Sequence, residues 1–203
     1  MKFTYFESPD KFGTWLEENA TCDICGAERK CFDGSFFIGE DEIDAICPEC
    51  LASGGLQEKD IYTCQGDREE LQKQIRMLNP AMDLLSVEHI VNEKTIELEK
   101  VTPALVTWQD WEWPACDGDY CIFIGYGSQS LYNQLASDKN GKLLFQNSIY
   151  HIMDDDADTD EMWEDELPEK QIRNSKDAEG LSPLFYVFKS LHGMKIVTIW
   201  DID

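Results

Sequence analysis

The sequence of 203 residues has few basic residues, few histidines and no long apolar run. It contains 17 Lys and Arg against 41 Asp and Glu, which gives a formal net charge of −24 at pH 7. Such a charge repels phosphate backbones and anionic lipid, so we expect neither nucleic acid nor a membrane surface as a partner. No stretch approaches the roughly 20 apolar residues needed to cross a bilayer.

The first residues, MKFTYFESPDKFGTW, also lack the apolar stretch of a signal peptide, because polar residues interrupt them every few positions. We therefore expect a cytoplasmic protein. In a reducing compartment, cysteines at short spacing are more often metal ligands than disulfide partners. This expectation bears directly on the eight cysteines of the chain.

Catalytic motifs are also missing from the sequence. The three histidines, His89, His151 and His192, form no HExxH motif and pair with no recognisable nucleophile motif. The stretch GYGSQS follows a predicted strand but lacks the third glycine and the βαβ context of a phosphate-binding loop. We assign no catalytic residue from the sequence.

Two cysteine pairs are the clearest motif that is present. Cys22 and Cys25 form a CxxC pair, and 21 residues separate it from the pair Cys47 and Cys50. Two CxxC pairs at this separation predict one tetrahedral zinc site of the ribbon type. Because four thiolates leave no open position on the ion, the site is expected to be structural.

An iron–sulfur cluster and two redox pairs are the alternatives for these cysteines. A thioredoxin-type CxxC opens a helix, whereas residues 27–34 are polar and lead to a predicted strand, so zinc is favoured. Zinc ribbons often bind nucleic acid, but residues 21–51 hold two basic and eight acidic residues, a net charge of −6. This charge argues against contact with phosphates.

Four further cysteines, Cys31, Cys64, Cys116 and Cys121, lie outside the two pairs. Cys116 and Cys121 are separated by four residues, which is tolerable ligand spacing, and they are our candidate second site. Free cysteines are commonly buried as small hydrophobic residues. We therefore expect a single Zn²⁺ and no second ion.

Periodicity and turn signals predict an α+β fold, packed as one globular unit. Residues 1–65 are expected to form a small four-cysteine zinc-ribbon module, residues 66–100 a helical insert, and residues 101–203 an antiparallel-rich α+β region. Between the cysteine pairs, residues 35–47 are predicted to form a strand, an acidic turn and a second strand, as a hairpin that joins the pairs.

The remaining predicted elements rest on capping residues and apolar runs. They are a strand at residues 2–6 with one helical turn after it, a helix capped by Asp67, a second helix capped by Asn79 with Pro80 at its first position, a strand over Cys121–Gly125, a helix over 128–141 closed by an Asn-Gly turn, a strand over 142–152, and two final strands joined at His192 and Gly193.

The segment 154–169 contains ten acidic residues, no basic residue and three large apolar ones. Blocks of like charge are usually solvated and flexible. The other interpretation is an acidic interaction segment with an aromatic anchor, because a solvated tail has no need of a tryptophan. The candidate partner-binding residues are Asp154, Asp155, Asp156, Asp158, Asp160, Glu161, Trp163 and Glu164.

Two blocks, about residues 1–56 and 101–127, resemble the CbrC family of bacterial proteins, which is linked by name to colicin tolerance. The residues that carry this resemblance are Cys22, Cys25, Cys47, Pro48, Cys50, Trp108, Gln109, Cys116, Gly118, Asp119, Cys121, Phe123 and Gly125. The family motif C-G-D-x-C is one residue longer here, and residues 128–203 have no counterpart in the resemblance. The family has no agreed biochemical activity, so the resemblance implies a zinc-bearing module without a reaction.

Charge and resemblance together favour a non-enzymatic, zinc-stabilised acidic protein that binds a basic protein partner, such as a toxin or nuclease that it neutralises. The alternative is a metal- or thiol-dependent enzyme with a site around Cys116 and Cys121, using Asp117 or Asp119 beside Trp108 and Trp111. That site would need an open metal position or a reactive thiol of low pKa.

Overall fold

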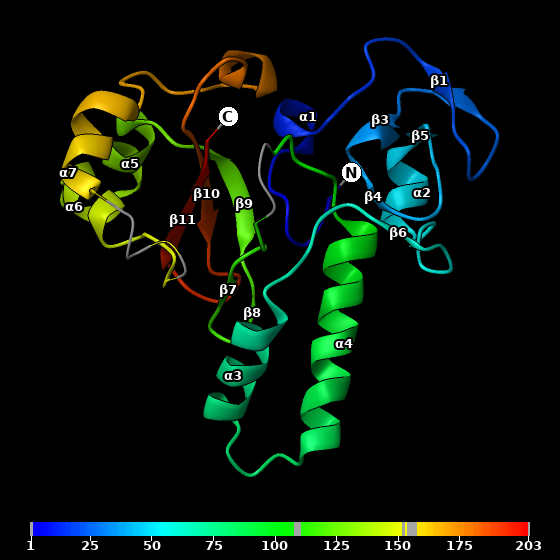
Figure 1. Cartoon of the computed structure of the whole chain (residues 1–203), viewed down its shortest axis with the longest axis horizontal. Helices are drawn as coiled ribbons and strands as arrows, with labels where there is room; N and C mark the ends of the chain where they lie inside the picture. Colours follow the sequence, from blue (N-terminus) through cyan, green and yellow to red (C-terminus); the bar gives the residue numbers. More distant parts are fainter. Residues whose placement is uncertain (1, 108–110, 152, 154–157, 203) are drawn as a thin grey trace.

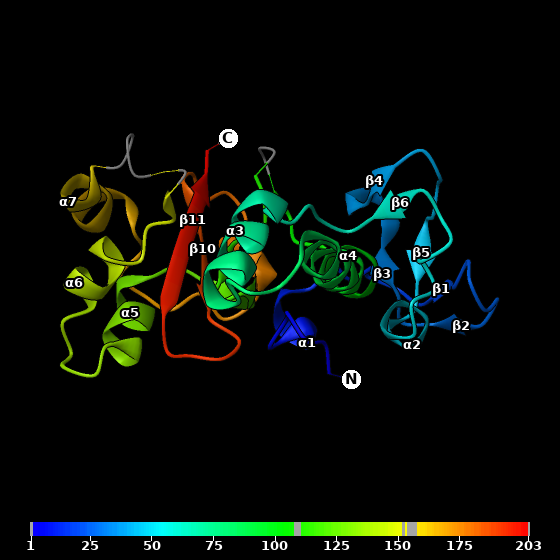
Figure 2. The ribbon, with the colours of Figure 1, turned by 90° about the horizontal axis from the view of Figure 1, so that it is seen from below.

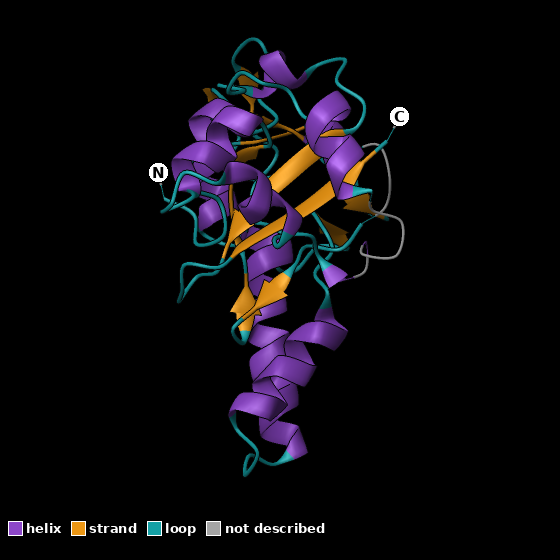
Figure 3. Ribbon diagram, turned by 90° about the vertical axis from the view of Figure 1, so that its left-hand side faces the viewer, coloured by secondary structure: helices purple, strands orange, loops and turns teal. Residues whose placement is uncertain are grey.

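The computed structural model describes residues 2–107, 111–151, 153 and 158–202. It has the predicted α+β fold (Figure 1). A module of short strands around the paired cysteines lies at one side, and a three-stranded sheet lies at the other. A helical hairpin extends from between these two parts, as Figure 3 shows from the side.

The cysteine module is built from very short elements. Its strands pair as β1–β2, β3–β5 and β4–β6, all antiparallel. The elements are α1 (Pro9–Phe12), β1 (Ala20–Thr21), β2 (Glu28–Arg29), β3 (Phe32–Asp33), η1 (Gly34–Phe36), β4 (Ile38–Gly39), β5 (Ala45–Ile46), α2 (Pro48–Ala52) and β6 (Ile61–Tyr62). Residues 35–47 do not form the predicted hairpin. β4 pairs with β6, which follows the second cysteine pair, and β5 pairs with β3.

The helical hairpin consists of α3 (Arg68–Leu78) and α4 (Leu84–Val101). Asp67 caps α3 as predicted, since its side chain accepts a hydrogen bond from the Glu70 backbone N–H. The predicted cap at Asn79 and Pro80 is wrong, because Asp83 caps α4 instead. Asn79 closes the preceding helix, where its side-chain amide donates to the Ile75 carbonyl (3.0 Å).

The main sheet has the order β11–β10–β9, with antiparallel neighbours. Its strands are β9 (Ile122–Tyr126), β10 (Leu184–Lys189) and β11 (Ile196–Asp201). The predicted strand before Gly125 and the two final strands are thus confirmed. A hairpin, β7 (Ala115–Cys116) and β8 (Asp119–Tyr120), precedes β9.

Single parallel bridges extend this sheet at both edges. Phe6 bridges to Phe123 beside β9, and Ile149 bridges to Thr198 beside β11. The predicted strand at residues 2–6 is therefore present only as this bridge. In both places, backbone hydrogen bonds from the neighbouring residues hold the segment to the strand.

Short helices complete the C-terminal half: α5 (Gln129–Leu135), α6 (Gly141–Gln146), α7 (Thr159–Glu161), the π-helical turn η3 (Met162–Glu166) and η4 (Ser175–Ala178). The predicted strand over 142–152 is wrong, because its first half is helix α6. The Asn140 side chain accepts from the Leu143 N–H, so the Asn-Gly pair begins α6 instead of closing the predicted helix over 128–141, which ends at Leu135 as α5. Among the described helices, none combines the length and apolar character needed to cross a bilayer.

Side chains alternate between the two faces of the main sheet. Phe185 and Val187 belong to the apolar cluster shared with α5 and α6, whereas Tyr186 and Phe188 belong to the larger core. That larger core also contains Phe32 of the cysteine module, and in Figure 2 helix α4 lies between this module and the sheet. The three parts of the chain share one core, while the boundaries at residues 65 and 100 stay predictions.

Replacing Asp67, which caps α3, should cost much more stability than replacing Asp83, which caps α4. Asp67 is 4% exposed and accepts from both the Glu70 N–H (2.9 Å) and the Tyr150 hydroxyl (2.8 Å), whereas Asp83 is exposed. We expect Asp67→Ala to lower the free energy of unfolding by about 2–4 kcal/mol and Asp83→Ala by about 1 kcal/mol. Urea unfolding measures both, and equal losses would contradict a role for the Tyr150 contact.

Candidate metal centre

The first cysteine pair lies in a tight turn between β1 and β2. The Cys22 N–H donates to the Ala27 carbonyl (3.0 Å), and the Gly26 N–H donates back to the Cys22 carbonyl (2.8 Å). Gly26 has a φ of 70°, a left-handed conformation that glycine adopts without steric cost. The turn brings both sulfurs to the same side of the chain, toward the second pair.

The second pair lies at the start of helix α2. Cys47 is the N-cap residue and Pro48 occupies the first turn, where its fixed φ suits a helix start. The Cys47 backbone N–H donates to the Cys22 sulfur (3.3 Å), which links the two pairs directly. Helix α2 is thereby placed so that Cys47 and Cys50 face the first turn.

The four sulfurs converge on one point. All four lie within 4.8 Å of one another, and the Cys25 and Cys47 sulfurs are 3.9 Å apart. Four sulfurs at 2.3 Å from a tetrahedral ion would be about 3.8 Å apart, so the cluster fits one ion. A disulfide needs about 2.05 Å between sulfurs, and all eight cysteines are free.

Backbone hydrogen bonds favour the thiolate form of Cys22, against the effect of burial. Burial alone would raise the pKa of the Cys22 thiol, but backbone N–H groups that point at its sulfur outweigh it and lower the pKa to about 7. These donors belong to Cys47, Cys25 and Ile24. Metal binding requires thiolates, so this arrangement prepares Cys22 for an ion.

Cys31 is buried near the cluster but lies outside it. Burial, followed by the charges of the neighbouring cysteines, raises the pKa of Cys31 to about 11. Its thiol points at the Ala20 carbonyl oxygen (3.6 Å). Cys31 therefore remains a protonated core residue beside the site.

Asp23 supports the cluster, although the sequence pattern did not single it out. Its carboxylate accepts from the backbone N–H groups of Asp44 (2.8 Å) and Ala45 (3.0 Å). These bonds fasten the first turn to the strand that leads into the second pair. On the surface, Arg29 and Glu49 form an ion pair (3.2 Å) that joins β2 to α2. The position of Asp23 between the two cysteines of the first CxxC pair was the only feature of the sequence that could have indicated its hydrogen bonds to Asp44 and Ala45.

The candidate second site does not become a metal cluster. Cys116 and Cys121 are 2% and 0% exposed, and a hydrogen bond between them lowers the pKa of Cys116 and raises that of Cys121. Within the described residues, no group of three or more Cys, His, Asp or Glu gathers its ligand atoms as closely as the four cysteines of the two pairs do.

Asp119, which belongs to the alternative enzyme site, makes contacts with four other residues through its carboxylate. It is 2% exposed and accepts from the Tyr5 hydroxyl (2.9 Å) and the Tyr120 N–H (2.9 Å). The Lys94 ammonium and the His192 ring also contact its carboxylate, the latter at 3.2 Å. These four partners come from separate segments of the chain, so no sequence motif could have indicated that they meet at Asp119.

The candidate partner-binding residues lie on α7 and η3 as far as the structure describes them. Asp158, Asp160, Glu161 and Glu164 are exposed, while Trp163 is partly buried. The Trp163 ring lies 6.3 Å from the Tyr132 ring and 5.9 Å from the Phe145 ring. Asp154, Asp155 and Asp156 lie outside the described residues, as do Trp108 and Gln109 of the predicted Trp-Cys block.

Comparison with known proteins gives a family but no fold relative. The sequence model of an uncharacterised protein family (UPF0167) matches residues 1–202. The match covers far more of the chain than the two blocks that carried the resemblance, and it includes the C-terminal part that seemed to lack a counterpart. No solved structure matches the chain.

Cysteine-to-serine variants separate the ligands from their neighbour. We expect Cys22→Ser and Cys47→Ser to lose at least about 90% of the bound transition metal, because a serine hydroxyl is not deprotonated at neutral pH. Cys31→Ser should keep the metal, since its hydroxyl can still donate to the Ala20 carbonyl. Metal-to-protein ratios of the purified variants measure this, and equal loss in Cys31→Ser would contradict the ligand set.

Proposed function

Because the chain belongs to the uncharacterised protein family UPF0167, the CbrC-type family, we propose its function from its own residues: a non-enzymatic, zinc-stabilised acidic protein that binds a basic protein partner. The observation that carries the proposal is an acidic face held in a fixed conformation on α7 and η3. This face consists of the exposed residues Asp158, Asp160, Glu161, Glu164, Asp165 and Glu166.

Zinc is the proposed ion because four thiolates in tetrahedral arrangement are a typical structural zinc site. Four protein ligands complete the coordination, so the ion would hold the module together rather than activate a substrate. The strands of the module are two residues long each, and such strands are too short to be stable alone. The binding energy of the ion would supply folding energy that these strands lack.

The acidic face is ordered by its apolar residues. Met162 and Leu167 are buried, and they belong to the same apolar cluster as Tyr132 and Phe145. At the start of α7, the Asp158 side chain accepts from the Glu161 N–H (3.2 Å) and caps the helix. With the apolar side chains turned inward, the carboxylates of the segment are left at the surface.

Trp163 acts within this arrangement as an internal anchor. Its ring packs on the aromatic rings of α5 and α6, and its carbonyl oxygen accepts from the Gln129 side-chain amide (2.7 Å). Lys142 of α6 pairs with both Asp160 (2.7 Å) and Glu164 (2.8 Å). The residues offered to a partner are thus the carboxylates that carry no such ion pair, chiefly Glu161, Asp165 and Glu166.

Electrostatics explain how such a face would select its partner. The net charge of −24 attracts a basic protein over long range and raises its association rate. A face that is already ordered loses less conformational entropy on binding than a flexible acidic tail would. Like charges also disfavour nucleic acid and anionic membranes as competitors.

A narrower hypothesis names a basic toxin or nuclease as the partner, which this protein would neutralise by covering its substrate-binding surface. It rests on the resemblance to a family linked by name to colicin tolerance. The acidic face is suited to this role because surfaces that bind phosphate backbones are basic.

The zinc proposal is tested by metal analysis and metal removal. We expect one zinc per chain, and after chelation we expect faster backbone hydrogen exchange in residues 20–56 than in β9, β10 and β11. Hydrogen exchange with mass spectrometry resolves the two regions. Iron in place of zinc would overturn the choice of ion, and unchanged exchange in residues 20–56 would overturn the structural role.

The partner proposal is tested with two charge-matched variants. One variant carries Glu161→Gln, Asp165→Asn and Glu166→Gln, and the control carries Glu18→Gln, Glu69→Gln and Glu88→Gln. We expect a basic protein captured from the native organism to associate about tenfold more slowly with the first variant and less than twofold more slowly with the control.

Added salt provides the independent check on the electrostatic basis. At about 1 M salt, screening over roughly 3 Å should abolish most of the association-rate advantage. Surface plasmon resonance with the captured partner measures these rates. Capture of no basic protein, or an equal effect of both variants, would count against the acidic face as the binding site.

A further inference from the structure

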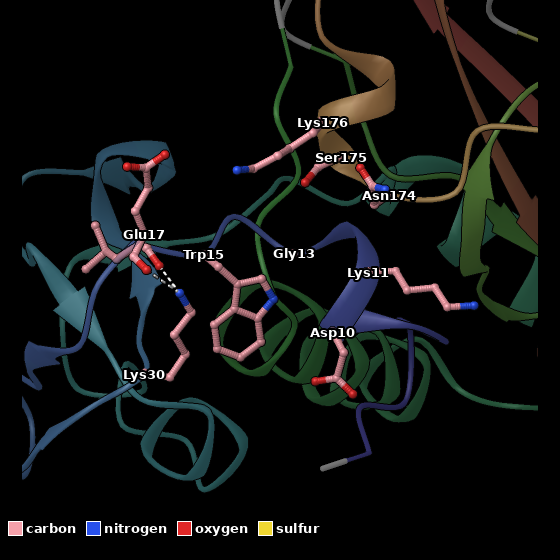
Figure 4. Close-up of a pocket in the computed structure, with 10 residues that line it drawn as sticks. Asp10, Lys11, Gly13, Trp15, Glu17, Lys30, Asn174, Ser175 and Lys176 are labelled. Carbon is pink, nitrogen blue, oxygen red and sulfur yellow. Dashed lines mark hydrogen bonds between the residues drawn. The ribbon is translucent and has the colours of Figure 1, made fainter.

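A cavity of about 600 Å³ lies between the loop that follows α1 and the turn η4 (Figure 4). A second cavity of about 270 Å³ adjoins it and shares Gly13, Trp15, Glu17, Ser175 and Lys176 with its lining. The inner cavity reaches apolar residues of the core, among them Val106, Tyr126 and Leu184. Pockets of this size, with an apolar floor and a few polar groups, are typical of small-molecule sites.

Thr14, which lines the inner cavity, has a buried hydroxyl without a partner among the described residues. Thr14 is 5% exposed, and its hydroxyl oxygen has no hydrogen-bond partner among the described residues. Its backbone is satisfied, since the Thr14 carbonyl accepts from the Asp33 N–H (2.7 Å). A buried hydroxyl that makes no hydrogen bond is destabilising, so a polar atom of a ligand at this position would remove the cost.

Trp15 gives both cavities an aromatic wall. One face of its ring packs on Phe32, with a centroid distance of 4.1 Å and an angle of 32° between the planes. The indole N–H donates to the Pro9 carbonyl (2.8 Å), which fixes the orientation of the ring. Since the side chain is partly exposed and lines both cavities, its other face is available for stacking by a flat ring.

Two ammonium groups face the outer cavity from opposite sides. Lys30 is held by the backbone carbonyls of Leu16 and Glu17, and Lys176 reaches across from η4 in Figure 4. The outer lining holds three lysines against Asp10 and Glu17, a net charge of +1 in a chain of net charge −24. The inner lining adds Glu179 and no further basic residue, so the two cavities together are neutral, and Lys30 and Lys176 supply the positive charges for one carboxylate.

We propose that these adjoining cavities bind a small aromatic carboxylate. Its ring would stack on Trp15, a polar substituent on the far side of the ring would bond to the Thr14 hydroxyl, and its carboxylate would lie between Lys30 and Lys176. This site is separate from the acidic face and from the four-cysteine cluster, and it does not depend on the function proposed for either.

Three related probes test the two polar contacts by isothermal titration calorimetry. We expect the dissociation constant of para-hydroxybenzoate to be at least about fivefold lower than that of benzoate, which lacks the hydroxyl. It should also be at least about fivefold lower than that of para-hydroxybenzamide, which lacks the charge. Thr14→Val should remove the preference over benzoate, whereas Thr14→Ser should keep it. Lys176→Gln should remove the preference over the amide, and Lys2→Gln is its control, because Lys2 is exposed and lines neither cavity.

Thermal unfolding of the ligand-free protein gives a second readout. Thr14→Val should be as stable as the wild type or more stable, because it removes the unpaired hydroxyl while it keeps the shape of the side chain. A stable Thr14→Val protein that has lost the preference supports the site. Absence of saturable binding of para-hydroxybenzoate up to about 10 mM, or preferences unchanged by Thr14→Val and Lys176→Gln, would overturn it.

Discussion

The packing of aromatic rings around Phe123 is the interaction on which the rest of the structure depends. Phe123 is fully buried on β9, and the rings around it come from segments far apart in the sequence. These rings belong to Phe6, Phe12, Trp113, Tyr126, Tyr186 and Phe188, with centroids 5.1 to 6.5 Å from that of Phe123. This packing of rings joins the N-terminal segment, Trp113 in the segment before β7, and the main sheet.

The four-cysteine cluster lies in a module whose strands are only two residues long, so backbone hydrogen bonds between strands contribute little to the stability of that module. Phe32 is one of the residues by which the module contacts the shared core, and it packs on both Phe3 and Trp15. The same ring therefore fixes the wall of the proposed ligand cavity. Folding of the cysteine module and the shape of that cavity are linked through Phe32, although the two sites perform separate tasks.

Charge is distributed unevenly over the molecule, and this gives its surfaces different preferences. Around α7 and η3, carboxylates face outward because Met162 and Leu167 occupy the apolar side of the segment. At the outer cavity beside η4, Lys30 and Lys176 lie in the same lining as Asp10 and Glu17, so this lining is not dominated by acidic residues. These two regions are therefore the ones that we propose for a basic partner and for a small anion.

The sequence by itself determined the cluster of four cysteines, the cap at Asp67 and the final strand pair, because each depends on residues close together or on a fixed spacing. It failed where an element is chosen by distant packing: residues 141–146 became a helix because Phe145 packs on Tyr132, and β4 paired with β6. Only the tertiary structure turned Trp163 inward, surrounded Asp119 with four partners and left the Thr14 hydroxyl unpaired in a cavity. These three features depend on contacts between segments that are far apart in the sequence, and a local sequence pattern does not specify such contacts.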